Sequence, residues 1–188
     1  MGDWTVMDII AGRLQDGDIL HHDSPHCDDR PDPDDVGLLV VHNISLPPGC
    51  FGRPHIEALF LGALDSQAHQ AFSSLEGLRV SAHVLIRRDG TVVQFVPFHR
   101  RAWHAGVSSY QGRNACNDFS IGIELEGTDT WVFTYAQYAK LAAVTAALCC
   151  HYPRLTLDNI VGHSEIAPGR KSDPGSAFDW DYFRQLLT

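Results

Sequence analysis

The stretch of residues 162–175 brings together three side chains that could perform chemistry, His163, Lys171 and Asp173. It also holds three glycines and two prolines. Glycine costs backbone entropy and proline removes a backbone donor, so the stretch can be neither a helix interior nor a central strand. We expect a surface loop, and loops on a rigid scaffold often carry reactive groups. An imidazole, a carboxylate and a nearby ammonium suit metal-assisted hydrolysis.

His42 is the third candidate metal ligand. It ends the apolar run 37–42, which is typical of a strand buried on both faces, and ligands gather at the carboxyl ends of such strands. Catalytic zinc is usually held by three His or carboxylate ligands, which leaves a fourth position for water. We therefore predict a Zn²⁺ site made of His42, His163 and Asp173. Taken singly, each histidine could instead be a strand end or a loop residue without a ligand. Neither segment contains the cysteines of a closed structural zinc site.

Apolar and acidic residues alternate along the run 121–126. In a strand, one face would carry Ile121, Ile123 and Leu125, and the other Gly122, Glu124 and Glu126. A glycine beside two carboxylates indicates a face that lines a cavity and is closely approached by another group. We take Glu124 as the general base, although periodicity alone does not distinguish it from Glu126. A solvated outer face is the alternative for Glu126.

Four further residues have a possible role toward a substrate or transition state. Lys171 could stabilise an oxyanion near the metal, or it could be a surface lysine beside Arg170. Trp103 could form a stacking wall for a sugar, with His104 next to it in the same loop; the alternative is a half-buried tryptophan and a hydrogen-bonded histidine. Arg79 could pair with a substrate carboxylate, or it could be an ordinary surface arginine.

The elements that must position these residues follow from the same sequence. In chain order we predict a solvated lead-in over 22–36, a strand over 37–42, partial helix over 54–76, a hairpin over 79–97, a strand over 119–126 and helices over about 134–150 and 178–187. The pair Asp89-Gly90 predicts the hairpin turn, and Thr134 with Gln137 predicts a capping box. The buried stripe of the first long helix would comprise Tyr138, Leu141, Ala142, Thr145 and Leu148. The last helix would bury Phe178, Phe183 and Leu187.

Composition restricts the class of protein. The 188 residues fit one domain, and 44% hydrophobic with 20% charged residues is typical of a soluble globular protein. A net charge of -9 argues against nucleic acid as the main partner. No stretch is long and apolar enough for a membrane span, no signal peptide is recognisable, and the five cysteines lack a C-x-x-C motif. We expect a cytoplasmic address, no membrane association and no obligate protein partner.

Five ordered strings of the sequence resemble the zinc N-acetylmuramoyl-L-alanine amidases. They are LLVVHNIS, RVSAHVLIRRDG, RAWHAG, SIGIELEG and GHSEIAPGRKSDPG. The resemblance covers roughly residues 20–187, and is strongest to the cytosolic branch of the family that acts on 1,6-anhydro-muropeptides in peptidoglycan recycling. The resemblance implies an α/β (α+β-like) single domain, with a central mixed β-sheet flanked by helices and a zinc groove on one side. We divide residues 1–188 into a lead-in over 1–21 and a catalytic core over 22–188.

The resemblance also assigns roles to residues. It implies zinc ligands at His42, His163 and Asp173, and it favours Glu124 over Glu126 as the catalytic carboxylate. It matches Lys171 to the family's catalytic lysine, and it places Asn43, Arg79, Trp103 and His104 in the substrate groove. The implied reaction is hydrolysis of the amide between N-acetylmuramic acid and the L-alanine of the stem peptide.

Two departures and two competing functions accompany the resemblance. Wider relatives often have cysteine where this chain has Asp173, and aspartate points to the cytosolic branch. Close relatives often have a basic residue where this chain has Ala115, so Arg113 is a candidate to replace it in recognising the peptide carboxylate. The competing functions are a periplasmic amidase on intact peptidoglycan, which would need an export signal, and a binding module without catalysis, which would typically lack some of the five site residues.

Overall fold

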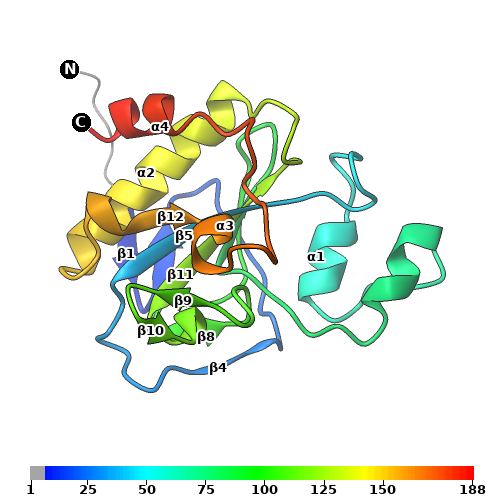
Figure 1. The fold of residues 1–188 in the computed structure, drawn as a ribbon, viewed down its shortest axis with the longest axis horizontal. Helices are drawn as coiled ribbons and strands as arrows, with labels where there is room; N and C mark the ends of the chain where they lie inside the picture. The colour runs from blue at the N-terminus through cyan, green and yellow to red at the C-terminus, as the bar shows by residue number, and fades with distance from the viewer. Residues whose placement is uncertain (1–6) are drawn as a thin grey trace.

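A mixed sheet of six strands forms the centre of the computed structural model, which describes residues 7–188 (Figure 1). The strand order is β12-β5-β11-β6-β7-β3. These strands are β3 Leu20–His21, β5 Leu38–Ile44, β6 Val84–Ile86, β7 Val92–Gln94, β11 Ser120–Glu126 and β12 Ile160–Gly162. All neighbours are parallel except β6 and β7, which form the predicted hairpin. The predicted mixed sheet flanked by helices is confirmed.

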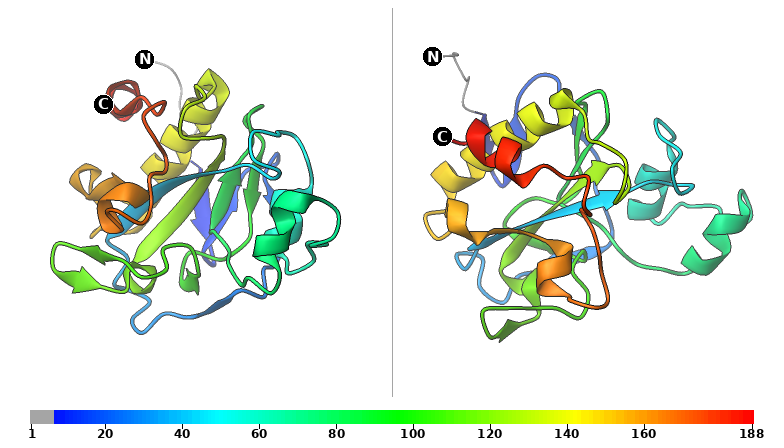
Figure 2. Two further views of the ribbon diagram at one scale, coloured as in Figure 1. Left: turned by 45° about the vertical axis from the view of Figure 1, so that its right-hand side comes forward. Right: turned by 45° about the horizontal axis from the view of Figure 1, so that its top comes forward.

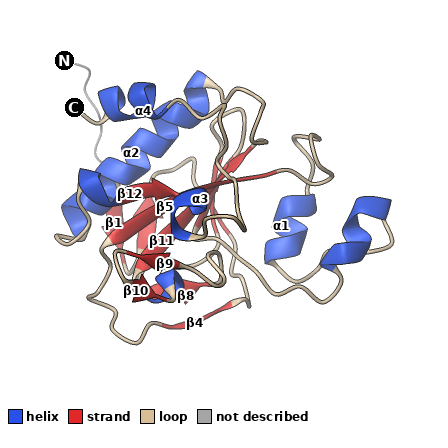
Figure 3. Ribbon diagram, viewed as in Figure 1, coloured by secondary structure: helices blue, strands red, loops and turns tan. Residues whose placement is uncertain are grey.

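Helices cover both faces of this sheet. They are α1 His55–Phe60, α2 Tyr135–His151, α3 His163–Ile166 and α4 Trp180–Leu186, with 3-10 helices at Gln70–Leu75, Cys116–Asp118 and Leu157–Asn159. Helices α2 and α4 lie together on one side, and α1 with the first 3-10 helix lies on the other (Figures 2 and 3). Within residues 7–188, none of the helices has the length and apolar character needed to cross a bilayer.

The strands β5 and β11 divide their side chains between two faces. In β11, Ile121, Ile123 and Leu125 are fully buried in the core beneath α2. In β5, Leu38 and Val40 point to the opposite face, into a separate apolar cluster. Because β-strand side chains alternate, His42 shares the face of Leu38 and Val40. The face opposite α2 is therefore the one available for chemistry.

The predicted helices are largely correct. Helix α2 begins with the predicted capping box, because the Thr134 side chain accepts from the Gln137 backbone and the Gln137 side chain accepts from Thr134 N–H. All five residues of its predicted stripe are buried. Helix α4 is shorter than predicted because the Asp179 side chain caps it; Phe178 and Phe183 are buried, but Leu187 is only half-buried. The region 54–76 splits into α1 and a 3-10 helix.

The predicted solvated lead-in over 22–36 is correct for the exposed residues 31–34 but wrong for residues 26–30. This segment forms β4, Cys27–Asp29, which pairs with β8, Arg100–Ala102. His26 and Arg30 are both buried. The Arg30 guanidinium donates to four backbone carbonyls, those of Phe98, Asn117, Asp118 and Ser120. Each of its three nitrogens therefore has a hydrogen-bond partner although the residue is buried.

The residues before position 22 also belong to the fold. Strands β1, Asp8–Ile10, and β2, Arg13–Gln15, form a hairpin whose Leu14 is buried in the main core. Strand β3 pairs with β7 at the edge of the central sheet. The expected division at residue 21 therefore falls inside one structural unit, and residues 1–6 of that lead-in lie outside the described residues. A last small hairpin pairs β9, Ser109–Tyr110, with β10, Arg113–Asn114.

Candidate metal centre

The three predicted metal ligands converge at the carboxyl ends of β5 and β12. His42 lies near the end of β5, and His163 begins α3 directly after β12, which pairs with β5. His42 Nδ1 is 2.9 Å from His163 Nδ1 and 3.1 Å from Asp173 Oδ2, and His163 Nδ1 is 3.0 Å from the same oxygen. Residues far apart in the chain thus present three donor atoms in one small triangle.

This triangle fits a divalent transition metal ion. Tetrahedral zinc with bonds of about 2.0–2.1 Å has ligand atoms about 3.3 Å apart, close to the observed separations. Two imidazoles with one carboxylate are a donor set that zinc accepts in catalytic sites. His42 and His163 are only 1% and 3% exposed, so bulk water reaches the donors poorly. Among the described residues, His42, His163 and Asp173 form a group whose ligand atoms lie close enough together to hold a metal ion.

The second ring nitrogen of each histidine also has a partner. His163 Nε2 lies 3.2 Å from the Ala105 carbonyl, which can only accept, so the proton of this ring is on Nε2 and Nδ1 is free to bind a metal. His42 Nε2 lies 2.9 Å from His104 Nδ1. Such outer partners fix the orientation and tautomer of metal-binding imidazoles.

Burial and mutual contact set the charges in the triangle. Burial lowers the pKa of His42 to about 4, which keeps this imidazole neutral at physiological pH. Burial alone would raise the pKa of Asp173, but its contacts with His163 and His42 hold it well below the usual range of a carboxyl. A neutral imidazole and an ionised carboxylate are the protonation states in which His42 and Asp173 can bind a metal.

Glu124 lies next to His42 in the β5–β11 register and is half-buried. Its Oε2 is buried without a hydrogen-bond partner. Burial, assisted by the charge of Asp173, raises the pKa of Glu124 well above its ordinary value, and the charge of Lys171 opposes that rise. A carboxylate with a raised pKa and a free oxygen can accept and return a proton.

Glu126 differs from Glu124 although both lie on the same strand face. It is 2% exposed, so the alternative of a solvated outer face is wrong. One carboxylate oxygen accepts from the Gly52 N–H and the other from Arg88 N–H, at 3.1 Å. Both carboxylate oxygens of Glu126 therefore bond backbone N–H groups, which indicates a structural role for this residue. Glu124 is the candidate base that remains.

The stretch 162–175 is a loop only in part. It begins with the single turn α3, and the bond from Ser164 N–H to the Asp173 carbonyl closes it on itself. Arg170 NH2 donates to the carbonyls of Ala105 and Val107, each at 2.7 Å. Lys171 is exposed beside this anchored residue, so it can reach a substrate that approaches the triangle.

Three residues expected in the substrate groove are tied to other protein groups. Asn43 Nδ2 donates to Asp129 Oδ1 at 2.7 Å and to the Pro174 carbonyl at 3.0 Å. Trp103 Nε1 donates to Asp28 Oδ1 at 3.0 Å, and its ring stacks on His26. His104 lies behind His42 and is half-buried. These contacts agree with the simpler interpretation of Trp103 and His104, in which protein neighbours hold both side chains.

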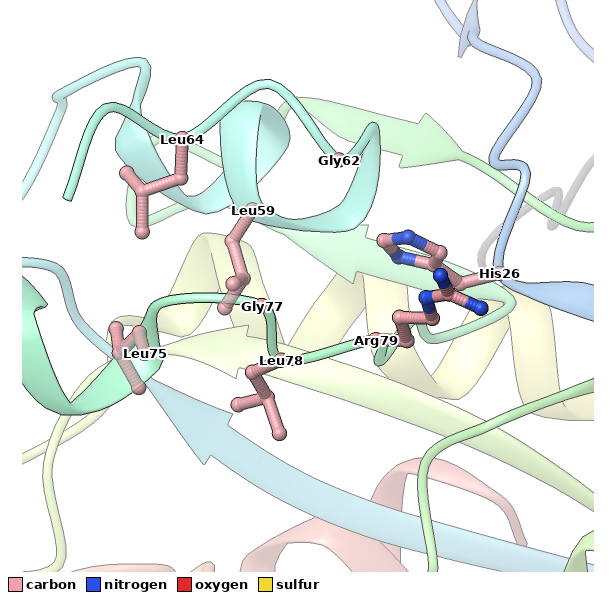
Figure 4. Close-up of a pocket in the computed structure, with 8 residues that line it drawn as sticks. All are labelled: His26, Leu59, Gly62, Leu64, Leu75, Gly77, Leu78 and Arg79. Carbon is pink, nitrogen blue, oxygen red and sulfur yellow. The ribbon is translucent and has the colours of Figure 1, made fainter.

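Arg79 is exposed and lies at a separate pocket of about 170 Å³. Figure 4 shows its guanidinium beside the His26 ring at one end of this pocket, with three of the lining leucines, Leu59, Leu64 and Leu75, toward the other end. Arg113 is the suggested replacement for a basic residue at position 115, but it pairs with Asp35 at 2.5 Å and lies over the Phe119 ring.

Two residues near the triangle were not assigned a role from sequence. Ser120 Oγ lies 3.1 Å from His104 Nε2, and no sequence pattern marks this serine. Gly122 did carry a signal, because a glycine on an inward face indicates close approach. A Cβ atom on Gly122 would lie 2.4 Å from His104 Cγ, so the approaching group is the His104 ring.

Comparison with known proteins agrees with this geometry. The family model described as N-acetylmuramoyl-L-alanine amidase matches residues 32–176. The "1,6-anhydro-N-acetylmuramyl-L-alanine amidase AmpD" of Citrobacter freundii is 65% identical over 165 residues, which are 88% of each chain. The AmpD of Escherichia coli K12 is also 65% identical over 165 residues, 88% of this chain and 90% of that protein. A crystal structure of an AmpD derivative superposes with a TM-score of 0.93 at 60% identity and covers 97% of this chain and 100% of that one.

Proposed function

This chain belongs to the N-acetylmuramoyl-L-alanine amidase family and is a hydrolase, and from that membership we propose how its site works and on what substrate. The proposed ligands of the metal are His42, His163 and Asp173. The proposed catalytic residues are Glu124 and Lys171. One observation carries this assignment: a buried carboxylate oxygen without a partner lies beside a triangle of metal-binding donor atoms.

The metal would be Zn²⁺, since the donor set and the family resemblance favour it, although Co²⁺ would accept the same ligands. Zinc supplies Lewis-acid chemistry, because it acidifies water and polarises a carbonyl oxygen. The protein's part is to hold the His42 imidazole neutral and the Asp173 carboxylate charged, as the low pKa values of these two groups indicate.

Glu124 moves the proton. The carboxylate takes a proton from the attacking water as the oxygen bonds to the amide carbon, and it then returns this proton to the nitrogen of the leaving L-alanine. The raised pKa of Glu124 suits both steps, because a stronger base removes a proton more readily and still releases it to a developing amine. Burial also keeps bulk water away from the carboxylate.

Lys171 stabilises the negative charge that develops on the carbonyl oxygen during attack. Its ammonium is exposed, but Arg170 fixes the loop beside it through two carbonyl bonds. A positioned charge near a partly dry site contributes more than a mobile one in water. Asn43 and Arg79 remain proposed substrate-binding residues; Arg79 has an exposed guanidinium that could pair with a carboxylate of the stem peptide.

The proposed substrate is a 1,6-anhydro-N-acetylmuramyl peptide released during peptidoglycan recycling, in the cytoplasm. Similar proteins carry this substrate in their names. A structure titled as AmpDh3 from Pseudomonas aeruginosa in complex with anhydromuramic pentapeptide is 30% identical, with a TM-score of 0.59 and 81% of this chain covered. The chain spans 60% of that protein, so its complex supports only the class of ligand.

The deciding experiment is mass spectrometry of the products from anhydro-muramyl tripeptide, with intact peptidoglycan in parallel. We expect free tripeptide and anhydro-sugar, lost on chelation and restored by Zn²⁺. Release of peptide from intact peptidoglycan at a comparable rate would instead support the competing amidase function. Absence of cleavage of either substrate by folded, zinc-loaded protein would contradict the proposal.

A further inference from the structure

A chain of hydrogen bonds runs from the metal triangle into the protein. His42 Nε2 lies 2.9 Å from His104 Nδ1, and His104 Nε2 lies 3.1 Å from Ser120 Oγ. The His42 and His104 rings meet edge to face, with centroids 5.0 Å apart. Ser120 is fully buried. The three side chains therefore form one continuous path that begins at the far side of a candidate metal ligand.

The direction of these bonds follows from the metal-facing nitrogen. If His42 Nδ1 binds a metal, its lone pair points into the triangle and the ring proton must lie on Nε2. His104 Nδ1 must then accept that proton's hydrogen bond, which places the His104 proton on Nε2. Among residues 7–188, Nε2 has one hydrogen-bond partner, the Ser120 hydroxyl, which accepts from it. Each group thus fixes the tautomer of the next.

We propose that His104, held by Ser120, is a positioning residue that fixes the tautomer and orientation of His42 for metal binding. This inference rests on the proposed metal centre, and it gives His104 a role other than substrate contact. Within the triangle, His104 hydrogen-bonds to His42 alone, at the ring nitrogen that faces away from the metal site. Its effect should therefore be on metal affinity and not on the binding of substrate.

The sheet is shaped to hold His104 in this place. Gly122 on β11 leaves the space that the imidazole fills, since a Cβ atom there would overlap the ring at 2.4 Å. Asn117 Oδ1 accepts from the backbone N–H groups of His104 and Ala105, at 3.2 Å and 2.8 Å, so the turn itself is fixed.

The same turn supports the second metal histidine. The Ala105 carbonyl accepts from His163 Nε2 at 3.2 Å, one residue after His104 meets His42. One short backbone segment thus orients both imidazoles of the triangle, through a side chain in one case and a carbonyl in the other. A carbonyl cannot be removed by substitution, whereas an imidazole can, so His104 is the position at which the role can be tested.

The test measures the dissociation constant of Zn²⁺ alone, by competition with a chromophoric chelator, for the native chain and three variants. His104→Leu keeps the side-chain volume and removes the acceptor; we expect affinity to fall 10- to 100-fold, about the usual effect of losing an outer partner. His104→Asn keeps an oxygen near the Nδ1 position and should recover most of that loss. Ser120→Ala should weaken binding several-fold.

A matched control is Ser108→Ala, which also removes a buried hydroxyl, but one bonded to Gly106 and Cys116. It should bind Zn²⁺ as the native chain does. At saturating Zn²⁺ the KM of His104→Asn should stay at the native value, and a raised KM would indicate substrate contact and overturn the positioning role. Co²⁺ absorption spectra should change for His104→Leu and not for Ser108→Ala.

The outcomes separate this inference from the metal centre on which it rests. Absence of Zn²⁺ binding by the native chain would overturn both. Native binding together with unchanged affinity in folded His104→Leu would overturn the positioning role alone. If His104→Leu does not fold, the comparison of His104→Asn with Ser120→Ala decides, because equal native-like affinity in both contradicts the proposal.

Discussion

Two glutamates on one strand face show how the surroundings of a residue decide its chemistry. Glu126 gives both of its oxygens to backbone N–H groups, whereas Oε2 of Glu124 has no partner. A buried carboxylate without a partner destabilises a fold, because no hydrogen bond or ion pair offsets the free-energy cost of removing the charge from water. Such a cost is common at catalytic positions, where a raised pKa is useful. Glu124 therefore has the surroundings of a catalytic group.

Replacing Glu124 by glutamine should separate catalysis from metal binding. Glutamine keeps the shape but cannot take a proton, so we expect kcat to fall about 10²- to 10⁴-fold with Zn²⁺ affinity unchanged. Glu124→Ala should behave in the same way. Turnover of the tripeptide substrate and the zinc content after dialysis are the two measurements. Near-native turnover in either variant would overturn the assignment of the base.

Replacing Asp173 by alanine should remove a ligand. We expect Zn²⁺ affinity to fall at least 10- to 100-fold and activity to be lost at limiting metal, as the triangle would keep two donors. Asp158→Ala, at an exposed carboxylate outside the triangle, is the matched control and should bind zinc normally. Competition with a chelator measures both, and full zinc occupancy in Asp173→Ala would contradict the assignment.

The residue types of the site could be predicted from sequence, but their contacts could not. His42 was recognisable because it ends an apolar strand, and His163 with Asp173 because they lie in a stretch that excludes regular structure. The choice between Glu124 and Glu126 rested on family resemblance, since alternation puts both on one face. Only the fold shows which of them meets backbone N–H groups.

At the scale of elements, local signals were reliable and boundaries were not. The capping box of α2 is a contact between residues three apart, so the sequence contains all of it. The hairpin strands are shorter than predicted, since the ladder joins only Val84–Ile86 to Val92–Gln94. Directly before β6, His83 also bonds the backbone of Gly122 on β11. That bond joins residues that are 39 positions apart in the chain, so the hydrophobic periodicity of the sequence does not reveal it.

Removal of the α2 capping box gives a test at this scale. Thr134→Ala deletes the acceptor for the Gln137 N–H, so the free energy of unfolding should fall by about 1 kcal/mol, within a range of about 0.5–2. Thr156 is a suitable control, because it precedes a 3-10 helix without any side-chain cap bond, and Thr156→Ala should change stability by less than about 0.5 kcal/mol. Urea denaturation measures both, and equal losses would contradict the role of the cap.

A buried polar cluster of Arg30, His83 and Ser120 ties distant segments of the molecule together. The Arg30 guanidinium joins the segment 22–36 to four backbone carbonyls in residues 98–120. The richness of 22–36 in His, Asp and Pro predicted a solvated segment, and the sequence does not show that Arg30 meets carbonyls 68 to 90 positions away. The family resemblance implied the fold class, but it did not reveal the burial of Arg30.

The same cluster makes the metal-free protein sensitive to acid. Burial holds the pKa of His83 well below the ordinary value of about 6.5 that it has in the unfolded chain. Below that pH the unfolded chain binds a proton that the folded chain does not, so stability is complete above about pH 6.5 and falls as pH decreases. His83→Asn keeps an acceptor for the Gly122 N–H. It should reduce the slope of unfolding free energy against pH by up to about 1.4 kcal/mol per pH unit.

Urea denaturation of the metal-free protein between pH 7.5 and 5 measures that slope. A native slope near zero, or an equal slope in His83→Asn, would contradict the prediction.

If the triangle binds a metal, the sequence separations within it would link this protein's abundance to the metal supply of the cell. His42 is 121 residues from His163 and 131 from Asp173, so the complete set of donors exists only after folding. An ion bound there would favour the folded chain alone, by about 2.7 kcal/mol when free metal is 100-fold above its dissociation constant. When zinc is scarce, the chain would lose this stabilisation, so a larger fraction of it would be unfolded and degraded by proteases. Cells starved of zinc would then contain less of this protein, and not merely an inactive form of it.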